Sequence, residues 1–268
     1  MPIKSVVTNR LGSNGIVRRE VRKNDGSKRL SRRVVREAAH AKTPDRIVIA
    51  PLNMMQMRIP IRSTSGLLYN RFREDAIAAM RSKAETGVKV RTATRNLDKE
   101  CLGTLHVIGA RPSTIAESKS ATYGFPASGF KGSLMEAAKD AGVHSTIIGR
   151  CLFVEGDHHN LVKITPDGAR GAFEHVWTTQ RPKSAGVSSR YLLDEWSAVL
   201  TIRFDADRIS QEALLQLVIR AGVFIGIASW RLWNGHTCGS FGGWEVIQNK
   251  IRVTQLLGIG LAPRRASR

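Results

Sequence analysis

The chain has 268 residues, of which 42 are Lys or Arg and 22 are Asp or Glu, so its formal net charge is 42 − 22 = +20. Apolar residues make up 42% of the sequence, which is ordinary globular usage and excludes a chain that is disordered throughout. No stretch approaches the ~18 consecutive apolar residues of a membrane span, and no apolar signal segment follows Met1, so we expect an intracellular protein without membrane partners.

The first segment, residues 1–45, is strongly basic and poor in apolar side chains. Residues 1–46 contain 13 Lys or Arg and four Asp or Glu, a local net charge of 13 − 4 = +9. Such a segment buries too little apolar surface to fold alone, so we interpret it as a flexible arm that meets phosphate or an acidic partner, with a solvated tail as the alternative. The arm residues expected to contact nucleic acid are Arg18, Arg19, Arg22 and Lys23.

One domain is predicted over residues 46–258, followed by a basic tail at 259–268. Apolar richness and late alternation predict a strand from Ile47 that ends near Arg62. The elements expected next in chain order are a turn at 63–66, a helix from about 70 to 83 with Phe72, Ala76, Ala79 and Met80 at helical spacing, and a basic, poorly patterned insertion at 86–122.

In the second half of the domain, apolar periodicity again separates helices from strands. Alternation is strongest at 196–204, which predicts a strand, and Ser210 is a plausible cap for the helix that follows. The full set expected here is a helix over 130–139 closed by Gly142, short strands at 147–154 and 161–164, a polar loop at 166–189, the strand at 196–204, a helix at 209–221, a Gly- and Trp-rich loop at 226–243 and a strand at 244–247. This order predicts an α+β fold with a ferredoxin-like, RRM-like βαββαβ core that carries a basic insertion and the basic arm.

Three local motifs occur along this order. The first, Ile59-Pro60-Ile61-Arg62-Ser63-Thr64-Ser65-Gly66-Leu67-Leu68, is a strand that runs into a turn of small residues. The second is Phe125-Pro126-Ala127-Ser128-Gly129-Phe130-Lys131-Gly132-Ser133-Leu134. The third has two pieces, Gly226-Ile227-Ala228-Ser229-Trp230-Arg231 and Gly239-Ser240-Phe241-Gly242-Gly243-Trp244-Glu245-Val246.

Together the three motifs resemble the repeat-associated mysterious protein (RAMP) superfamily, in particular the crRNA-binding backbone subunits of CRISPR effector complexes. They also resemble a group of uncharacterised tailed-bacteriophage proteins. In the RAMP pattern, a Pro-x-Ser-x-x-Lys-Gly loop, matched here by Pro126 to Gly132, opens a helix. The resemblance implies a non-enzymatic protein that binds nucleic acid in the cytoplasm of a bacterial cell or a phage-infected host.

The residues themselves support phosphate binding at the second motif. A helix that opens after Gly129 offers backbone amides to an anion, and Lys131 in its first turn opposes the helix dipole unless an anion binds. The alternative is that Lys131 points to water. The core residues expected to contact nucleic acid are Arg62, Arg71, Arg73, Ser128, Lys131, Trp230, Arg231, Trp233 and His236, the last four by stacking or base contact from a glycine loop that can approach a partner closely. For the two tryptophans, a place in the hydrophobic core is the alternative.

Catalysis, cofactors and metals are not expected. The turn at 63–65 has no Asp where RNA-cleaving relatives of the resembled family carry one. His158 and His159 lie near Glu155 and Asp157, but adjacent strand residues point to opposite faces, so a solvated turn is favoured over a metal site. Cys101, Cys151 and Cys238 are odd in number and widely spaced, which predicts reduced thiols.

Two functions of different classes stay open at this point. The first is a homo-oligomer or filament that assembles side by side along single-stranded RNA or DNA. The second is a phage virion or assembly protein with a RAMP-like fold, whose basic arm binds nucleic acid or an acidic partner. A metal-dependent nuclease is a third, poorly supported interpretation.

Overall fold

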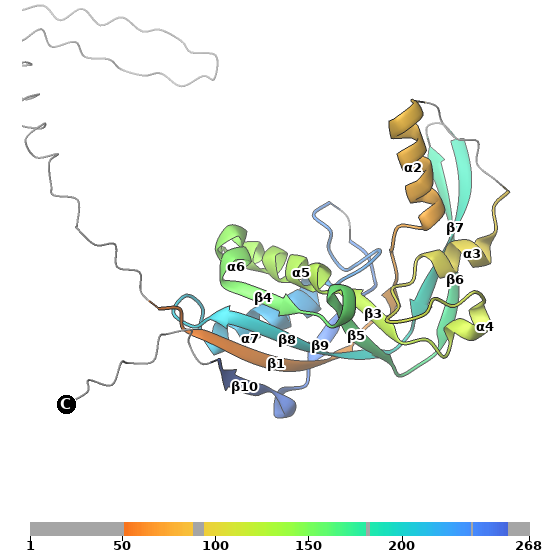
Figure 1. The fold of residues 1–268 in the computed structure, drawn as a ribbon. Coiled ribbons are helices and arrows are strands. Elements are labelled where there is room, and N and C mark those ends of the chain that lie inside the picture. Colours follow the sequence, from red (N-terminus) through yellow and green to blue (C-terminus); the bar gives the residue numbers. More distant parts are fainter. Residues whose placement is uncertain (1–50, 88–93, 181–182, 237, 257–268) are drawn as a thin grey trace, which may run out of the picture. The chain divides into compact units, whose positions relative to one another are not determined.

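The computed structural model describes residues 51–87, 94–180, 183–236 and 238–256, all in a unit that begins at Pro51. The expected arm at 1–45, with Arg18, Arg19, Arg22 and Lys23, and the expected tail at 259–268 lie outside the described residues. The described part has an α+β fold (Figure 1).

The larger sheet is built around β1 (Met54–Ser63) and β8 (Trp196–Asp205), which pair antiparallel along their lengths. Beyond β1 lie β9 (Trp244–Val246) and β10 (Arg252–Gln255), while β4 (Leu152–Glu155) and β5 (Leu161–Pro166) pair with successive parts of β8. At the far edge β3 (Tyr123–Pro126) pairs with β5. The strands predicted at 161–164 and 196–204 are confirmed.

Helices α5 (Ala127–Asp140), α6 (Ser145–Cys151) and α7 (Gln211–Arg220) share one hydrophobic core with this sheet. In β8, Leu200, Ile202 and Phe204 are buried in that core, whereas Val199 and Arg203, which alternate with the buried residues, are exposed. The prediction that Ser210 caps the last helix is confirmed, because its hydroxyl accepts a hydrogen bond from the Ala213 amide at 3.1 Å. Of the helices in the described ranges, none has the length and apolar character needed to cross a membrane.

A smaller, three-stranded sheet has β7 (Lys183–Leu193) between β2 (Leu67–Leu68) and β6 (Arg170–Gln180). Helix α3 (Leu97–Gly103) packs mainly on β7, and α4 (Ile115–Ser118) contacts β6. Helix α2 (Glu74–Thr86) precedes them, and short turns of helix occur at Ala221–Ile225, His158–Asn160 and Gln248–Lys250.

Three sequence-based expectations are wrong in detail. Most of the segment predicted as a polar loop at 166–189 belongs to the β6–β7 pair. Both faces of this pair make contacts that stabilise it: Ser189 and Tyr191 are buried on one face, and Phe173 and His175 pack against Trp230 on the other. Of the strand predicted at 147–154, residues 152–154 lie in β4, but residues 147–151 lie in α6, at whose start His144 accepts a hydrogen bond from the Thr146 amide. The apolar face predicted for the first helix is not buried: α2 begins at Glu74, after Phe72, which is 68% exposed, and within α2 Met80 is 58% exposed and no residue is buried.

Candidate nucleic-acid interface

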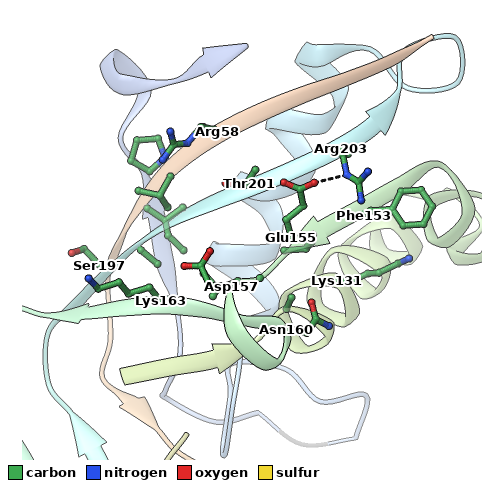
Figure 2. Close-up of a pocket in the computed structure, with 18 of the residues that line it drawn as sticks. Arg58, Lys131, Phe153, Glu155, Asp157, Asn160, Lys163, Ser197, Thr201 and Arg203 are labelled. Atoms are coloured by element: carbon green, nitrogen blue, oxygen red, sulfur yellow. Dashed lines mark ion pairs between the residues drawn. The ribbon is translucent and has the colours of Figure 1, made fainter. Parts of the chain in front are cut away.

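The face of the larger sheet opposite its helices is open and hollowed. The hollow has a volume of about 1080 Å³ and is lined from β1, β4, β5 and β8, from the loop after β4, and from the start of α5 (Figure 2). Its charged lining residues are Arg58, Lys131, Lys163, Arg203, Lys250, Glu155 and Asp157. We call this surface the sheet-face hollow. Its formal charge is 5 − 2 = +3.

Strand alternation places these charges. In β1 the side chains of Met57, Ile59 and Ile61 are buried, so Arg58, which lies between them, is exposed on the opposite face. By the same alternation Lys163 lies between buried Val162 and Ile164 in β5. The cations therefore occupy the outward positions of strands whose inward positions form the core.

The hollow carries two carboxylates, Glu155 and Asp157. Glu155 forms a salt bridge with Arg203 and accepts a hydrogen bond from Gln56 Nε2 at 2.9 Å (Figure 2). In the described part of the chain, no salt bridge involves Arg58, Lys163 or Lys250. These three cations are therefore available to an anionic ligand.

Lys131 reaches the hollow from α5 and is held by two contacts. Its ammonium donates a hydrogen bond to the Gly149 carbonyl of α6 at 2.8 Å and lies 4.8 Å from the ring centroid of Phe153. Because α5 begins at Ala127, Lys131 lies in the second turn, and the prediction that placed it in the first turn is wrong. These contacts hold the ammonium of Lys131 in place without a bound anion, and Phe153 keeps 44% of its surface exposed.

We expect Lys131→Met to lower the free energy of unfolding by about 1–2 kcal/mol, because a charge-assisted hydrogen bond and a cation–π contact are lost. Urea denaturation of the variant and the parent protein measures the change. Lys139→Met is the matched control, since Lys139 makes only an exposed i,i+3 salt bridge with Glu136 and its loss should change stability by less than about 0.5 kcal/mol. Equal effects of both substitutions would show that the Gly149 contact contributes nothing.

The other predicted contact residues are divided between two regions. Ser128 is exposed and lines the sheet-face hollow, and Arg62 lies four positions after Arg58 on β1 but is paired with Glu245. Arg71 and Arg73 lie before α2, where Arg73 pairs with Glu100 at 2.9 Å. Arg71 lines a second, smaller hollow.

The glycine loop contacts the base of the β6–β7 pair and does not line the sheet-face hollow. Trp230 is partly buried, with its ring centroid 4.2 Å from His175 and 6.3 Å from Phe173. Arg231 is partly buried too, whereas Trp233 and His236 are exposed. For Trp230 the structure therefore favours the packing alternative, while Trp233 and His236 remain accessible.

The three sequence motifs meet at this loop. The Gly242 amide donates to the Gly66 carbonyl at 2.7 Å, and the Gly243 amide donates to Ser65 Oγ at 2.9 Å. Phe130 of the second motif contacts Trp244 of the third, with ring centroids 5.8 Å apart. The motifs thus form one packed junction between β1, α5 and β9.

Sequence reasoning missed Arg58, Phe153, Lys163, Arg203 and Lys250 as site residues. The available signal was the alternation of the strands, since each of the first four is an outward residue of a strand whose inward neighbours are apolar. Clusters of adjacent basic residues drew attention to the arm and to 62–73 instead. The charged residues of the hollow are spread singly over separate strands, so none of them indicates a binding surface until the open face of the sheet is known.

Known proteins provide no further assignment: no family model matches the sequence, and no curated protein matches it significantly. Within the described ranges, no three His, Cys, Asp or Glu residues are grouped so that they could hold a metal ion. His159 and Asn160, of which Asn160 lines the sheet-face hollow, both have positive φ, of 58° and 60°. Residues 158–160 therefore form a short turn of helix and not a strand, in agreement with the turn predicted there.

Proposed function

We propose that the protein binds single-stranded RNA or DNA across the sheet-face hollow without acting as an enzyme. The observation that carries this proposal is the combination of a +3 hollow on an open sheet with the exposed ring of Phe153 (Figure 2). Phosphates would meet Arg58, Lys163 and Lys250. A base would stack on the free side of Phe153, which a paired duplex base cannot do.

The strand order supports a ferredoxin-like core as the finer description of the fold. The order β9/β10–β1–β8–β4, with α5 between β1 and β4 and α7 between β8 and β9, is the one expected of a βαββαβ unit, to which β5 and β3 are added beside β8. The α2–α4 segment and the β6–β7 pair are then insertions into that core. A RAMP-type relationship is consistent with this order, and we propose it together with the function.

We also propose that copies of the chain assemble side by side along the strand. The exposed apolar side chains of Phe72 before α2, of Met80 on α2 and of Val176 on β6 at 65% support self-association, because exposed large apolar side chains favour contact with another protein surface. The alternative function, a phage structural protein, depends chiefly on the arm, which lies outside the described residues.

The proposal predicts a steep salt dependence. If about six phosphates are neutralised per subunit, log affinity against log salt should have a slope near −4 for a single strand. Fluorescence titration of labelled single-stranded RNA and DNA with the full chain, from low to physiological salt, measures the slope for each. A slope flatter than about −1, or no binding to either, would overturn the proposal. A high absorbance ratio at 260 and 280 nm in the purified protein, reversed by nuclease, would support it independently.

A further inference from the structure

A second hollow adjoins the first. It has a volume of about 320 Å³, and its lining includes Arg71, His106 and Arg111. The two hollows share Ser128, in the first turn of α5, and Asn160, in the turn after β4. We call the second one the arginine hollow. A chain that crosses the sheet face can therefore continue past Ser128 and Asn160 into it.

A single carboxylate bridges the two guanidinium groups of the arginine hollow. Glu74 Oε1 accepts a hydrogen bond from Arg111 Nη1 and a longer one, at 3.5 Å, from Arg71 Nη2. Arg71 is also held by the Gly103 carbonyl, at 3.4 Å from Nη1. The Glu74 side chain is 74% exposed at the first residue of α2, so it can turn into solvent without leaving a buried polar group unpaired.

The described lining of the arginine hollow carries no carboxylate: Glu74 reaches the two guanidinium groups from a neighbouring hollow of about 910 Å³, which Arg71 and Arg111 also line. Burial first, and then the charges of Arg71 and Arg111, lower the pKa of His106 to about 4. Burial also lowers the pKa of Arg71, and the charge of Arg111 adds to that effect. His106 is therefore neutral at neutral pH and can hydrogen-bond a ligand, and the two arginines repel each other in a way that an anion would relieve.

We propose that Arg71 and Arg111 form a phosphate site for the same bound strand, and that Glu74 occupies this site as a stand-in for the phosphate in the free protein. The inference rests on the proposed function, because it assigns one of the strand's phosphates. Two guanidinium groups that share one carboxylate oxygen can each donate to the two free oxygens of a phosphodiester. The exposed carboxylate gives way because a solvent-exposed ion pair contributes only about 0–1 kcal/mol.

The test compares two substitutions of opposite expected sign. Arg111→Gln should weaken binding of a labelled single-stranded oligonucleotide about 5- to 10-fold at low salt and flatten the salt slope by about 0.7, the value of one phosphate on a single strand. Glu74→Gln should tighten binding about 3- to 5-fold, because the competing charge is gone. Arg81→Gln is the matched control: Arg81 is an exposed cation on α2 outside both hollows, and its loss should change affinity less than twofold.

The outcomes separate this inference from the proposed function. If Arg58→Gln and Lys163→Gln weaken binding while Glu74→Gln and Arg111→Gln leave it unchanged, the arginine hollow is not a phosphate site and the sheet-face proposal survives. If the parent protein binds no strand, the proposed function itself fails. Weaker binding by Glu74→Gln would overturn the stand-in role. Thermal melting of each variant verifies folding, and Glu74→Gln alone decides the matter if Arg111→Gln does not fold.

Discussion

Gly242→Ala should destabilise the protein by about 3–5 kcal/mol, the range reached when a substitution strains a tightly packed backbone. A Cβ atom at this position would lie 1.9 Å from the Ile227 carbonyl oxygen, and the φ of Gly242 is +73°. Neither problem can be relieved by a rotamer change, because the obstructing atom is backbone. The same residue pair is joined by the Ile227 amide, which donates to the Gly242 carbonyl at 3.0 Å.

Gly132→Ala is the matched control for this substitution. Gly132 is exposed within α5, and a Cβ added there meets no atom within 4 Å. Its replacement should raise the free energy of unfolding by up to about 1 kcal/mol, since Ala favours the helix over Gly. Urea denaturation of both variants gives the comparison. Similar stabilities would contradict the close backbone approach between the two pieces of the third motif.

This pair of variants also bears on why the glycine loop contains glycine. The sequence alone allowed the interpretation that its glycines let a nucleic-acid partner approach. The structure provides an internal reason, because Gly239 and Gly242 each face a backbone carbonyl oxygen at 1.9 Å from the added Cβ. Destabilisation of the free protein by Gly242→Ala would establish that this packing, and not a partner, requires glycine there.

The second large effect is expected from reversing charges in the sheet-face hollow. The triple variant Arg58→Glu, Lys163→Glu and Lys250→Glu changes the formal charge of the lining from 5 − 2 = +3 to 2 − 5 = −3. Each lost phosphate contact weakens binding, and each new carboxylate repels the strand, so affinity for a single-stranded oligonucleotide at low salt should fall by about 100-fold or more. Fluorescence titration measures the loss.

A control with the same total charge change tests whether position or net charge is responsible. Lys83 of α2, Lys119 after α4 and Arg150 of α6 are all exposed and line neither hollow. When both triple variants are compared at 0.1 M salt, replacing these three with Glu should weaken binding far less, because long-range attraction between exposed charges is then screened within about 10 Å. Equal losses in both triple variants would mean that binding follows overall charge and that the sheet face has no special role.

Much of the core could be predicted because its pattern is local. In β8 every second residue from Trp196 to Phe204 is apolar, and that period of two has no helical interpretation. The last helix was predictable for a similar reason, since Ser210 marks its start and Leu214, Leu217 and Val218 follow at helical spacing. In these segments propensity, pattern and packing agree.

Segments whose stability comes from distant partners were not predictable in this way. Ile147 and Ile148 favour a strand by propensity, yet they lie in α6, where contacts with α5 override that preference. The β6–β7 strands are polar because only parts of their two faces are covered, by α3 and α4 on one side and by Trp230 and Phe241 on the other. Their pairing with each other and these partial contacts with α3, α4 and the glycine loop, rather than their composition, make them strands.

By itself, the sequence determined the charge, the α+β class, the strand at 196–204 and the helix after Ser210, because each depends on composition or on neighbours within a few residues. Only the tertiary structure decided which face of the sheet is open, and hence that Arg58 and Lys163 line one hollow while Lys131 is held by Gly149. It also brought the Glu74 carboxylate between the guanidinium groups of Arg71 and Arg111, although Glu74 and Arg111 are 37 positions apart in the sequence. Such sites arise from the packing of separate elements, and local sequence patterns carry no information about which separate elements will pack together.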